Sequence, residues 1–377
     1  MNDNKKLILK NSAIVLLLIV NVVSYVNTSG KLQDHMQQVD LEDFIYCTYL
    51  GGSMLDHVRD LVTDSQDNII VTGYTMSPDF PVKNPFQSSY AGGEQDMHGV
   101  SGDAFVAKFN KDWQLLWSTY LGGSSNDGAT CINVVADDSI IILGQTKSFN
   151  FPTTTDAYQQ DYSANYDIFI TKFASNGTLI YSSYLGTTTD DYINDCEVDP
   201  AGNLVLGGGT GSSAFPVTAD ADQPIYGGGF DGFLMRLSPN CSTILYSTFL
   251  GGSGFEGIDK FVIDTQGNII VSGPVGQSNF PITANAYQDS INGTHRDFFI
   301  AKFNPSGEII YATYFGGSHM DDCFGIGVDS SGNFIASGRT WSSDFPTVNA
   351  YQENYSAIEV DGIVTKFSAD GQELIFS

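Results

Sequence analysis

The stretch Tyr246-Ser-Thr-Phe-Leu-Gly-Gly-Ser253 decides the fold of this chain, because versions of it recur along nearly the whole sequence. The other versions begin at Tyr46, Trp117, Tyr181 and Tyr311, so that successive copies start 71, 64, 65 and 65 residues apart. A further step of 65 residues reaches Phe376, within a shortened version of the motif, Leu374-Ile-Phe-Ser377. Repetition at a fixed period of this length indicates a repeat-built domain before any residue is interpreted chemically.

Each repeat predicts four short β-strands, and the fourth copy shows them most clearly. The ranges 246–250, 260–264, 268–273 and 297–303 are rich in aromatic and β-branched residues and are separated by turn or loop residues. A tight turn is expected at Thr265-Gln-Gly-Asn268 and another at Asn304-Pro-Ser-Gly307, whereas the segment from 274 to 296 is a long polar loop. Four strands in each 65-residue period, with no helical periodicity, predict an all-β protein, a β-propeller with five blades in this chain. A fragment of a six- or seven-bladed ring is the alternative.

Several signatures recur in the same order in the copies, and the last copy shows them over 311–318, 329–338, 342–352 and 361–367. They are the Thr-Tyr-Leu-Gly-Gly block, the Asp-x-x-Gly-Asn turn, the Asp-Phe-Pro and Ala-Tyr-Gln segments of the long loop, and Asp-x-Phe-x-x-Lys. In these columns the chain resembles the SBBP family, the seven-bladed β-propeller repeat, over roughly residues 45–377. The resemblance implies a propeller in a secreted or surface protein. The strand order is also similar to that of NHL-type blades, with the Tyr-x-Thr-Tyr-Leu strand outermost.

The two ends of the repeat region pose a question about ring closure. The outermost strand is expected once before the first complete set, at 45–50, and again in short form at 373–377. A closed ring of five blades needs only one of these two strands. Either the N-terminal strand closes the ring and the tail lies loose, or the chain is a fragment of a larger propeller. An open strand edge invites association with another chain.

Composition excludes some classes of partner. The 377 residues carry 43 acidic and 16 basic side chains, a formal net charge of −27. Such a field repels phosphate backbones, so nucleic acid and anionic membrane surfaces are not expected partners.

The five cysteines show no metal-ligand spacing. Cys131 and Cys323 each stand six residues before an aspartate, Asp137 and Asp329, in copies that should not be neighbours. We therefore expect scattered buried thiols rather than a disulfide between these two.

The N-terminus predicts targeting out of the cell. Lys5, Lys6 and Lys10 precede an apolar run over 13–23, which is typical of a secretory signal peptide and short for a membrane span. We assign residues 1–30 as a signal peptide or N-terminal signal anchor, 31–44 as a linker and 45–377 as the propeller. The protein is expected to be extracellular or at the cell surface, with membrane contact only through such an anchor.

Blade geometry separates the loops onto two faces. The Gly-Gly loop and the long loop lie at one end of each blade, and the tight turns lie at the other, so a binding site is expected on the long-loop face. The acids that collect there include Asp127, Asp190, Asp191, Asp321 and Asp322. Such oxygen ligands suit calcium, but the spacing of a dedicated calcium loop is missing and no metal site is assigned. Because the acids repeat in every blade, a structural role at strand ends is the preferred interpretation.

Other recurring columns also have a structural and a functional interpretation. The column Lys108, Lys172, Arg236, Lys302 and Lys366 is expected to pair with blade carboxylates, and the phenylalanines before the loop prolines are expected to fasten the long loop. Tyr158, Tyr287 and Tyr351 are candidates for stacking on sugars, although packing is the simpler interpretation.

Two functions remain open at this point. The first is a structural or interaction module that binds protein or glycan partners, supported by the absence of a recognisable catalytic motif and of a blade with a distinctive reactive set. The alternative is a glycan-active enzyme, a lyase or hydrolase, that uses acids of the long-loop face. The first copy is six residues longer there and contains Glu94 and His98. No catalytic residue and no cofactor other than calcium is suggested.

Overall fold

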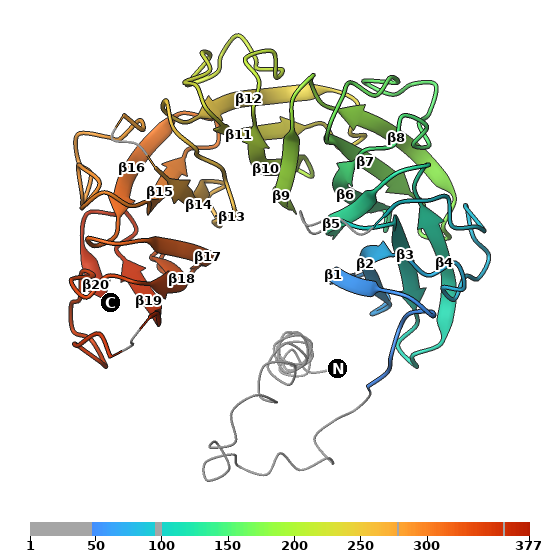
Figure 1. The fold of residues 1–377 in the computed structure, drawn as a ribbon, viewed down its shortest axis with the longest axis horizontal. Helices are drawn as coiled ribbons and strands as arrows, with labels where there is room; N and C mark the ends of the chain where they lie inside the picture. The colour runs from blue at the N-terminus through green and yellow to red at the C-terminus, as the bar shows by residue number, and fades with distance from the viewer. Residues whose placement is uncertain (1–46, 95–99, 277–278, 357–358) are drawn as a thin grey trace. The chain divides into compact units, whose positions relative to one another are not determined.

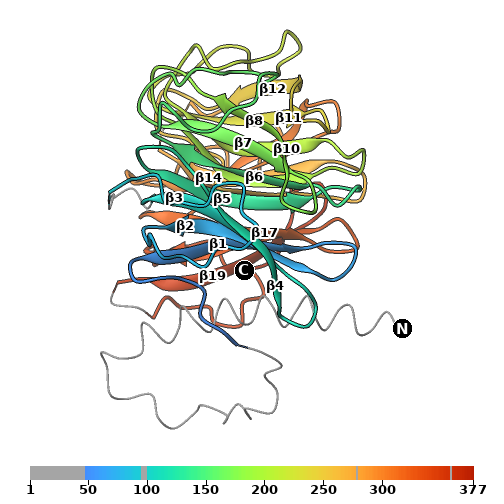
Figure 2. The same ribbon diagram turned by 90° about the vertical axis from the view of Figure 1, so that its right-hand side faces the viewer.

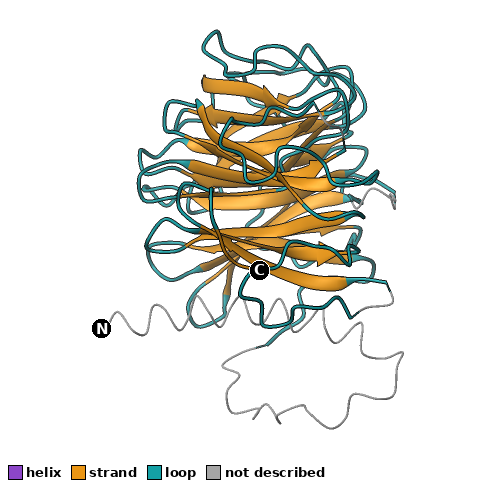
Figure 3. Cartoon of the chain, turned by 90° about the vertical axis from the view of Figure 1, so that its left-hand side faces the viewer, coloured by secondary structure: helices purple, strands orange, loops and turns teal. Residues whose placement is uncertain are grey.

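The computed structural model describes residues 47–94, 100–276, 279–356 and 359–377. The chain separates into two units, residues 1–49 and residues 50–377, and the fold below is that of the second unit. Within the described ranges the chain consists of strands and loops (Figure 1, Figure 3), and none of it forms a helix long and apolar enough to cross a membrane. The predicted signal segment lies outside the described residues.

Twenty strands form five antiparallel four-stranded sheets, here called blades 1 to 5. Blade 1 contains β1(Asp56–Thr63), β2(Ile69–Thr75), β3(Asp103–Phe109) and β4(Leu115–Leu121). Blade 2 contains β5(Asp127–Val134), β6(Ile140–Thr146), β7(Asp167–Phe173) and β8(Leu179–Leu185). Blade 3 contains β9(Asp191–Val198), β10(Leu204–Thr210), β11(Asp231–Leu237) and β12(Ile244–Leu250). Blade 4 contains β13(Lys260–Ile263), β14(Ile269–Val275), β15(Asp297–Phe303) and β16(Ile309–Phe315). Blade 5 contains β17(Asp321–Val328), β18(Phe334–Thr340), β19(Asp361–Phe367) and β20(Leu374–Phe376).

The predicted propeller architecture and strand order are confirmed. In every blade the strands pair in chain order, and in Figure 1 the first strand of each blade faces the centre while the fourth lies at the periphery. Because each chain segment runs up and down through its blade, connections leave the strands at two opposite ends, as the edge-on view in Figure 2 shows. The long-loop face and the turn face predicted from the sequence follow directly from this connectivity.

Four of the five hydrophobic clusters in the described residues lie between blades, and the fifth, around Phe80, Phe105 and Tyr120, lies within blade 1. One core joins Ile141, Ile170 and Tyr181 of blade 2 to Leu206 and Phe233 of blade 3. Equivalent clusters join blades 1 and 2, blades 3 and 4, and blades 4 and 5. A blade buries one apolar face only by stacking on its neighbour, which explains why the hydrophobic columns repeat with the period of the blade.

A basic side chain on the third strand of each of blades 1 to 4 donates to a carbonyl of the following blade. Lys108 pairs with Asp64 of its own blade at 2.8 Å and donates to the Ser175 carbonyl of the next blade at 3.1 Å. The predicted pairing is confirmed at four positions, Lys108–Asp64, Arg236–Asp199, Lys302–Asp264 and Lys366–Asp329. Lys172 forms no ion pair among the described residues, because Val135 occupies the position of the turn aspartate, and it donates to the Pro239 carbonyl at 3.0 Å.

The long loop is fastened by the phenylalanine that precedes its proline, as predicted. Phe151 is 3% exposed and its ring lies 4.6 Å from that of Phe169 on the third strand. A tyrosine of the outermost strand completes the contact: the Tyr184 hydroxyl donates to the Ser148 carbonyl at 2.7 Å and accepts from the Phe151 N–H at 2.9 Å. The Tyr-x-Thr-Tyr-Leu strand therefore holds the loop of its own blade before it crosses to the next.

The expectation that the C-terminal tail lies loose while the N-terminal strand closes the ring is wrong. Residues 374–376 do not lie loose, since they pair with β19 as the outermost strand of blade 5. The strand expected at 45–50 is absent from its described part, because residues 47–50 form no strand and Tyr49 is fully exposed. The motif forms a strand only where the third strand of a blade lies beside it.

Two of the expected free thiols form a disulfide. Cys131 of β5 is bonded to Cys196 of β9, which links blades 2 and 3, while Cys47, Cys241 and Cys323 are free. Cys131 and Cys323 are not in equivalent positions, because Cys131 lies opposite Leu143 and Cys323 opposite Gly338, the counterpart of Gly144. The two cysteines stand at the same distance from Asp137 and Asp329, but these aspartates are not equivalent. The turn of blade 2 starts at Val135, whereas that of blade 5 starts at Asp329.

Candidate functional site

On the long-loop face, a repeated acid begins the first strand of blades 1, 2, 3 and 5 and lies just before the first strand of blade 4. The Asp127 carboxylate accepts from the Gly123 N–H at 2.6 Å, the Ser148 hydroxyl at 2.7 Å and the Thr146 hydroxyl. The corresponding acids of the other blades are Asp56, Asp191, Glu256 and Asp321, each of which accepts from the N–H of the Gly-Gly loop before it. These acids hold the loop that leads from one blade to the next.

A second repeated acid begins each third strand. The Asp103 carboxylate accepts from the Ala91 N–H at 2.7 Å and from the Gln87 side chain at 3.2 Å. Its counterparts are Asp167, Asp231, Asp297 and Asp361, each bonded to an N–H of its own long loop. This acid therefore shapes the long loop just as the first acid shapes the Gly-Gly loop.

The two repeated acids face one another at the joint between blades. A β-carbon placed on Gly122 would lie 2.8 Å from an oxygen of Asp103 and 2.8 Å from an oxygen of Asp127, so only glycine fits between them. Burial, strengthened by the neighbouring carboxylate, raises the pKa of Asp103 to about 8, and burial raises that of Asp127 to about 7. Asp103 keeps one buried oxygen without a hydrogen-bond partner. The raised pKa values favour the protonated form of these carboxyls near neutral pH.

The same arrangement recurs at the next joints. Burial raises the pKa of Asp167 to about 7 and of Asp191 to about 6, and it raises the pKa of Asp297 to about 7. These carboxylates accept hydrogen bonds from loop N–H groups and are buried. Their role is therefore to hold the joint between blades.

The acids singled out from the sequence therefore divide into two groups. Asp127, Asp191 and Asp321 are fully buried joint residues. Asp190 is partly buried, and its carboxylate lies 3.3 Å from the Tyr166 N–H of the preceding blade. Asp322 belongs to a different arrangement, described below. Among the described residues no three His, Cys, Asp or Glu side chains are grouped so that they could hold a metal ion.

The three candidate stacking tyrosines are not brought together. Tyr287 packs edge-on against Phe367 at 5.7 Å, and the Tyr158 N–H donates to the Tyr181 hydroxyl. Tyr351 is fully exposed. All three lie beside outermost strands of different blades and have no ring contact with one another.

The extended loop of blade 1 is described only in part. The Glu94 N–H donates to the Asn126 side chain at 2.7 Å, and the Glu94 side chain is exposed. His98 lies outside the described residues.

Blade-specific side chains gather on the long-loop face of blades 4 and 5. We call them the rim cluster: His295, Arg296, His319, Asp322, Phe324, Arg339 and Trp341. The Asp322 carboxylate is bound by Arg296 at 2.8 Å and by Arg339 at 2.8 Å. The Arg339 guanidinium lies 4.5 Å from the Trp341 ring and 5.0 Å from the Phe324 ring. The rings of His295 and His319 are 5.3 Å apart.

The rim cluster combines buried and accessible groups. Asp322 is 5% exposed, whereas the side chains of Arg296 and Arg339 are 42% and 43% exposed and Phe324 is 54% exposed. The buried carboxylate thus orients two guanidinium groups whose remaining N–H groups have no protein partner in the described ranges. An arginine fork with an aromatic face beside it is suited to bind a planar anionic group.

A row of aromatic rings continues along the same face from blade 2 to blade 4. We call it the aromatic row: Tyr166, Tyr192, Phe230 and Phe255. Successive ring centroids lie 5.5, 5.9 and 4.9 Å apart, and the Lys147 ammonium lies 4.0 Å above the Tyr166 ring. Phe255 is 59% exposed. Rings of this kind provide flat apolar surface on the long-loop face.

The interpretation that no blade carries a distinctive set of side chains is corrected by the rim cluster. The position of Arg339 is occupied by Tyr74, Gln145, Gly209 and Pro274 in the other blades. Two of only four arginines in the chain meet at Asp322. Reading the columns that vary between copies, instead of those that repeat, could have found it.

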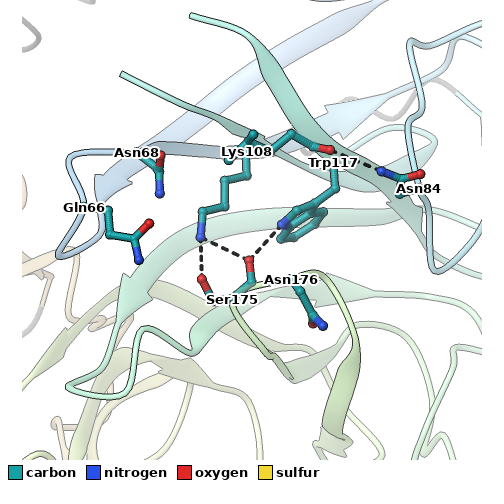
Figure 4. Close-up of a pocket in the computed structure, with 8 residues that line it drawn as sticks. Gln66, Asn68, Asn84, Lys108, Trp117, Ser175 and Asn176 are labelled. Atoms are coloured by element: carbon teal, nitrogen blue, oxygen red, sulfur yellow. Dashed lines mark hydrogen bonds between the residues drawn. The ribbon is translucent and has the colours of Figure 1, made fainter. Parts of the chain in front are cut away.

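A shallow cavity of about 380 Å³ lies on the opposite, turn face between blades 1 and 2 (Figure 4), lined among others by Asn68, Lys108, Trp117 and Ser175. Lys108 donates to the carbonyl and hydroxyl of Ser175, and the Trp117 indole donates to the same carbonyl at 3.0 Å. The polar groups of Lys108, Trp117 and Ser175 are therefore occupied by the link between the blades.

Comparison with known proteins adds likeness of fold. No protein-family model matches the chain, and no curated protein sequence matches it. Solved structures that resemble it include a Dyadobacter fermentans protein of unknown function, with 9% identity and a TM-score of 0.43 over 86% of this chain and 82% of that one. An ulvan lyase bound to a GlcA–Rha3S saccharide has 11% identity and a TM-score of 0.43, over 84% and 68%. A Xanthomonas campestris gluconolactonase has 11% identity and a TM-score of 0.33, over 77% and 84%. We draw nothing about activity or substrate from likeness at this level.

Proposed function

We propose that this protein is an extracellular or cell-surface propeller that acts as an interaction module and binds glycans carrying acidic sugars at the rim cluster. The observation that carries the proposal is the Arg296–Asp322–Arg339 arrangement beside Trp341. There, on the long-loop face, a buried carboxylate, two half-exposed arginines and aromatic rings that do not recur in the other blades meet. A protein partner that presents a carboxylate is the other occupant that this chemistry would accept.

The chemistry of the rim cluster favours a saccharide with a carboxylate or sulfate. Guanidinium groups held by one buried carboxylate can donate in parallel to such an anion, and sugar C–H faces pack on aromatic rings such as Trp341 and Phe324. This local positive group stands out in a chain of net charge −27, so it attracts an anion only at short range.

Three features support the extracellular placement. The apolar run at 13–23 follows three lysines, the repeat resembles the SBBP family, and a disulfide joins Cys131 to Cys196. Stable disulfides are typical of oxidising compartments. We therefore keep the signal peptide and SBBP membership as parts of the proposal.

Binding to a glycan array that contains neutral, uronate-bearing and sulfated oligosaccharides tests the proposal. We expect binding to the acidic members, and at least a tenfold loss in affinity for Arg339→Gln and for Trp341→Ala, measured by calorimetry with the best acidic member. Arg59→Gln is the matched control, since Arg59 belongs to blade 1, where its guanidinium lies 5.8 Å from the Tyr74 ring, and it should bind as the unmodified protein does.

The opposite outcomes are equally clear. Equal binding of neutral and acidic members, or unchanged affinity in both rim variants, would remove the rim cluster as the site. Release of new reducing ends or unsaturated products from the bound glycan would instead support the glycan-active enzyme.

A further inference from the structure

The cavity on the turn face between blades 1 and 2 marks a joint that departs from the repeat. At the position of Trp117 the next three blades carry Tyr181, Tyr246 and Tyr311. The Tyr246 hydroxyl accepts from the Asp222 N–H of its own long loop at 3.4 Å and donates to the Gly307 carbonyl of the next blade at 2.5 Å. A tyrosine at this position can therefore tie the long loop of its blade to the turn of the next blade.

A tryptophan cannot make both of these contacts. An indole has one donor and no acceptor, and the Trp117 indole donates to the Ser175 carbonyl of blade 2 at 3.0 Å. The long loop of blade 1 is also one residue shorter over 80–87 than the equivalent part of blade 2 over 151–159. Asn84 of this shorter loop and Trp117 both line the cavity. The cavity thus lies where the next joints have the tyrosine contact.

The charge inside the cavity is fully compensated. The Lys108 ammonium pairs with Asp64 at 2.8 Å and donates to the carbonyl and the hydroxyl of Ser175 at 3.1 and 2.6 Å. These three contacts use all three N–H donors of the ammonium. Lys108 is the only charged residue among the described residues that line the cavity. A ligand that enters it is therefore expected to be neutral, because an added charge would have no partner there.

Three amide side chains at the cavity keep groups for a ligand. Gln66, Asn84 and Asn176 are exposed and line the cavity, as Figure 4 shows. The Asn84 side-chain N–H donates to the Leu116 carbonyl at 3.5 Å, and the Asn176 side-chain carbonyl accepts from the Thr178 N–H at 3.1 Å. Within the described ranges, the Gln66 amide, the Asn84 carbonyl and the Asn176 amino group have no other partner. The cavity thus offers both donors and acceptors.

We propose that this cavity binds one residue of a neutral sugar. A sugar hydroxyl both donates and accepts a hydrogen bond, which matches the donor and acceptor groups of the three amides. Leu116 lines the cavity and is 36% exposed, so it supplies apolar surface for the C–H groups of a sugar ring. The volume of about 380 Å³ lies near the lower end of the range for small-molecule sites, about 300 to 1,000 Å³. The proposal does not depend on binding at the rim cluster, which lies on the opposite face.

Titration of the full chain with the methyl glycosides of glucose, galactose and mannose, followed by saturation-transfer NMR, tests the proposal. We expect at least one of them to bind with about millimolar affinity, as a small ligand held by few contacts does. Gln66→Ala should weaken this binding by about fivefold, the effect of one lost hydrogen bond. Because the Gln66 side chain is exposed and donates to no other described residue, thermal stability should not change.

Asn176→Asp separates a binding role from a structural one. The aspartate keeps the oxygen that accepts from the Thr178 N–H and removes only the amino group, so the turn is retained while binding should fall by about fivefold. Asn84 is left unchanged, because its φ of 45° favours asparagine. Gln266→Ala is the matched control, since Gln266 holds the position of Gln66 in the turn of blade 4, and it should bind as the unmodified protein does.

The absence of saturable binding for all three glycosides would overturn the proposal. The same affinity in Gln66→Ala, Asn176→Asp and the unmodified protein would also overturn it. So would an equal loss in Gln266→Ala, because the effect would then not come from the cavity. None of these results bears on acidic glycans at the rim cluster, so the two proposals fail separately.

Discussion

The repeated joint and the rim cluster lie on the same face, and two residues adjacent in the sequence belong one to each. Asp321 recurs in every blade, is fully buried, and accepts from the Gly317 N–H at 2.7 Å and the Ser342 hydroxyl at 2.9 Å. Asp322 has no acidic counterpart in the other blades and binds two half-exposed arginines instead. Asp321 holds the loop between two blades, whereas Asp322 orients two arginine side chains that are partly exposed to solvent.

The difference shows how repetition can be used to separate stability from binding. A side chain needed to join one blade to the next recurs with every blade, because each joint solves the same packing problem. A side chain that contacts a ligand at one place has no reason to recur. The following experiments test how far this division extends, beginning with the largest expected effect.

The buried lysine column should be the most costly feature to remove. Lys108→Met leaves the Asp64 carboxylate buried without its cation, and we expect a loss of about 3 kcal/mol in the free energy of unfolding. Lys172→Met is the matched control, because Lys172 has no carboxylate partner in the described residues and donates only to the Pro239 carbonyl. Its loss should be about half as large. Denaturant unfolding of both variants checks this, and equal losses would refute the role of the ion pair.

The disulfide is an exception to the rule that side chains in joints recur in every blade, because it occurs once and yet joins two blades. Replacing Cys131 and Cys196 together by alanine should lower the free energy of unfolding by about 2 kcal/mol or more, since the bond closes a chain segment of 65 residues. The free buried Cys323 is the control, and Cys323→Ala should cost about 1 kcal/mol. Unfolding followed with and without reductant checks both. An unchanged double variant would leave the joint held by packing alone.

The pair Asp321 and Asp322 tests the division directly. Asp321→Ala leaves the Gly317 N–H and the Ser342 hydroxyl without their acceptor, at a cost of about 2 kcal/mol. Asp322→Ala should cost less than about 1 kcal/mol, because its arginine partners can be solvated, and it should weaken binding of the acidic glycan. Calorimetry of unfolding and of binding measures both effects. The reverse order of stabilities would place Asp322 in the structural frame.

The joint carboxyls should also give stability a characteristic pH dependence. The folded-state pKa of Asp103 is raised to about 8 and that of Asp127 to about 7 from an ordinary value of 3.8. The folded chain therefore binds more protons than the unfolded chain between about pH 4 and about pH 8, so this stabilisation is complete below about pH 4 and is lost progressively as the pH rises from 4 to 8. Melting temperature should fall by roughly 5 °C between pH 5 and pH 8.5.

Asp103→Asn should flatten this dependence, since the amide keeps one oxygen for Ala91 and Gln87 and carries no proton to lose. Asp322→Asn, which alters a carboxyl outside the joints, should keep the slope of the unmodified protein. If melting temperature fell equally with pH in all three proteins, the carboxyls of the joints would not be the groups that cause this dependence.

Particular residues show what could be predicted and what could not. The strands, their order and the Lys–Asp pairing followed from columns spaced by the repeat, because local alternation and turn residues act within a few residues of each other. The disulfide was missed because Cys131 and Cys196 pair across a joint whose register includes an extra residue in each first strand. The rim cluster was missed because its residues come from three segments of two blades, 295–296, 319–324 and 339–341, and no repeated spacing in the sequence relates them.

The repeat alone therefore establishes the propeller, the number of blades and the face on which loops gather, since these depend on interactions that recur at every period. Tertiary structure decides which of two adjacent aspartates is buried in a joint and which holds two arginines. It also decides that the last motif forms the outermost strand of blade 5, whereas the described part of the first motif, residues 47–50, forms no strand. Those outcomes depend on the neighbour that each segment meets in space.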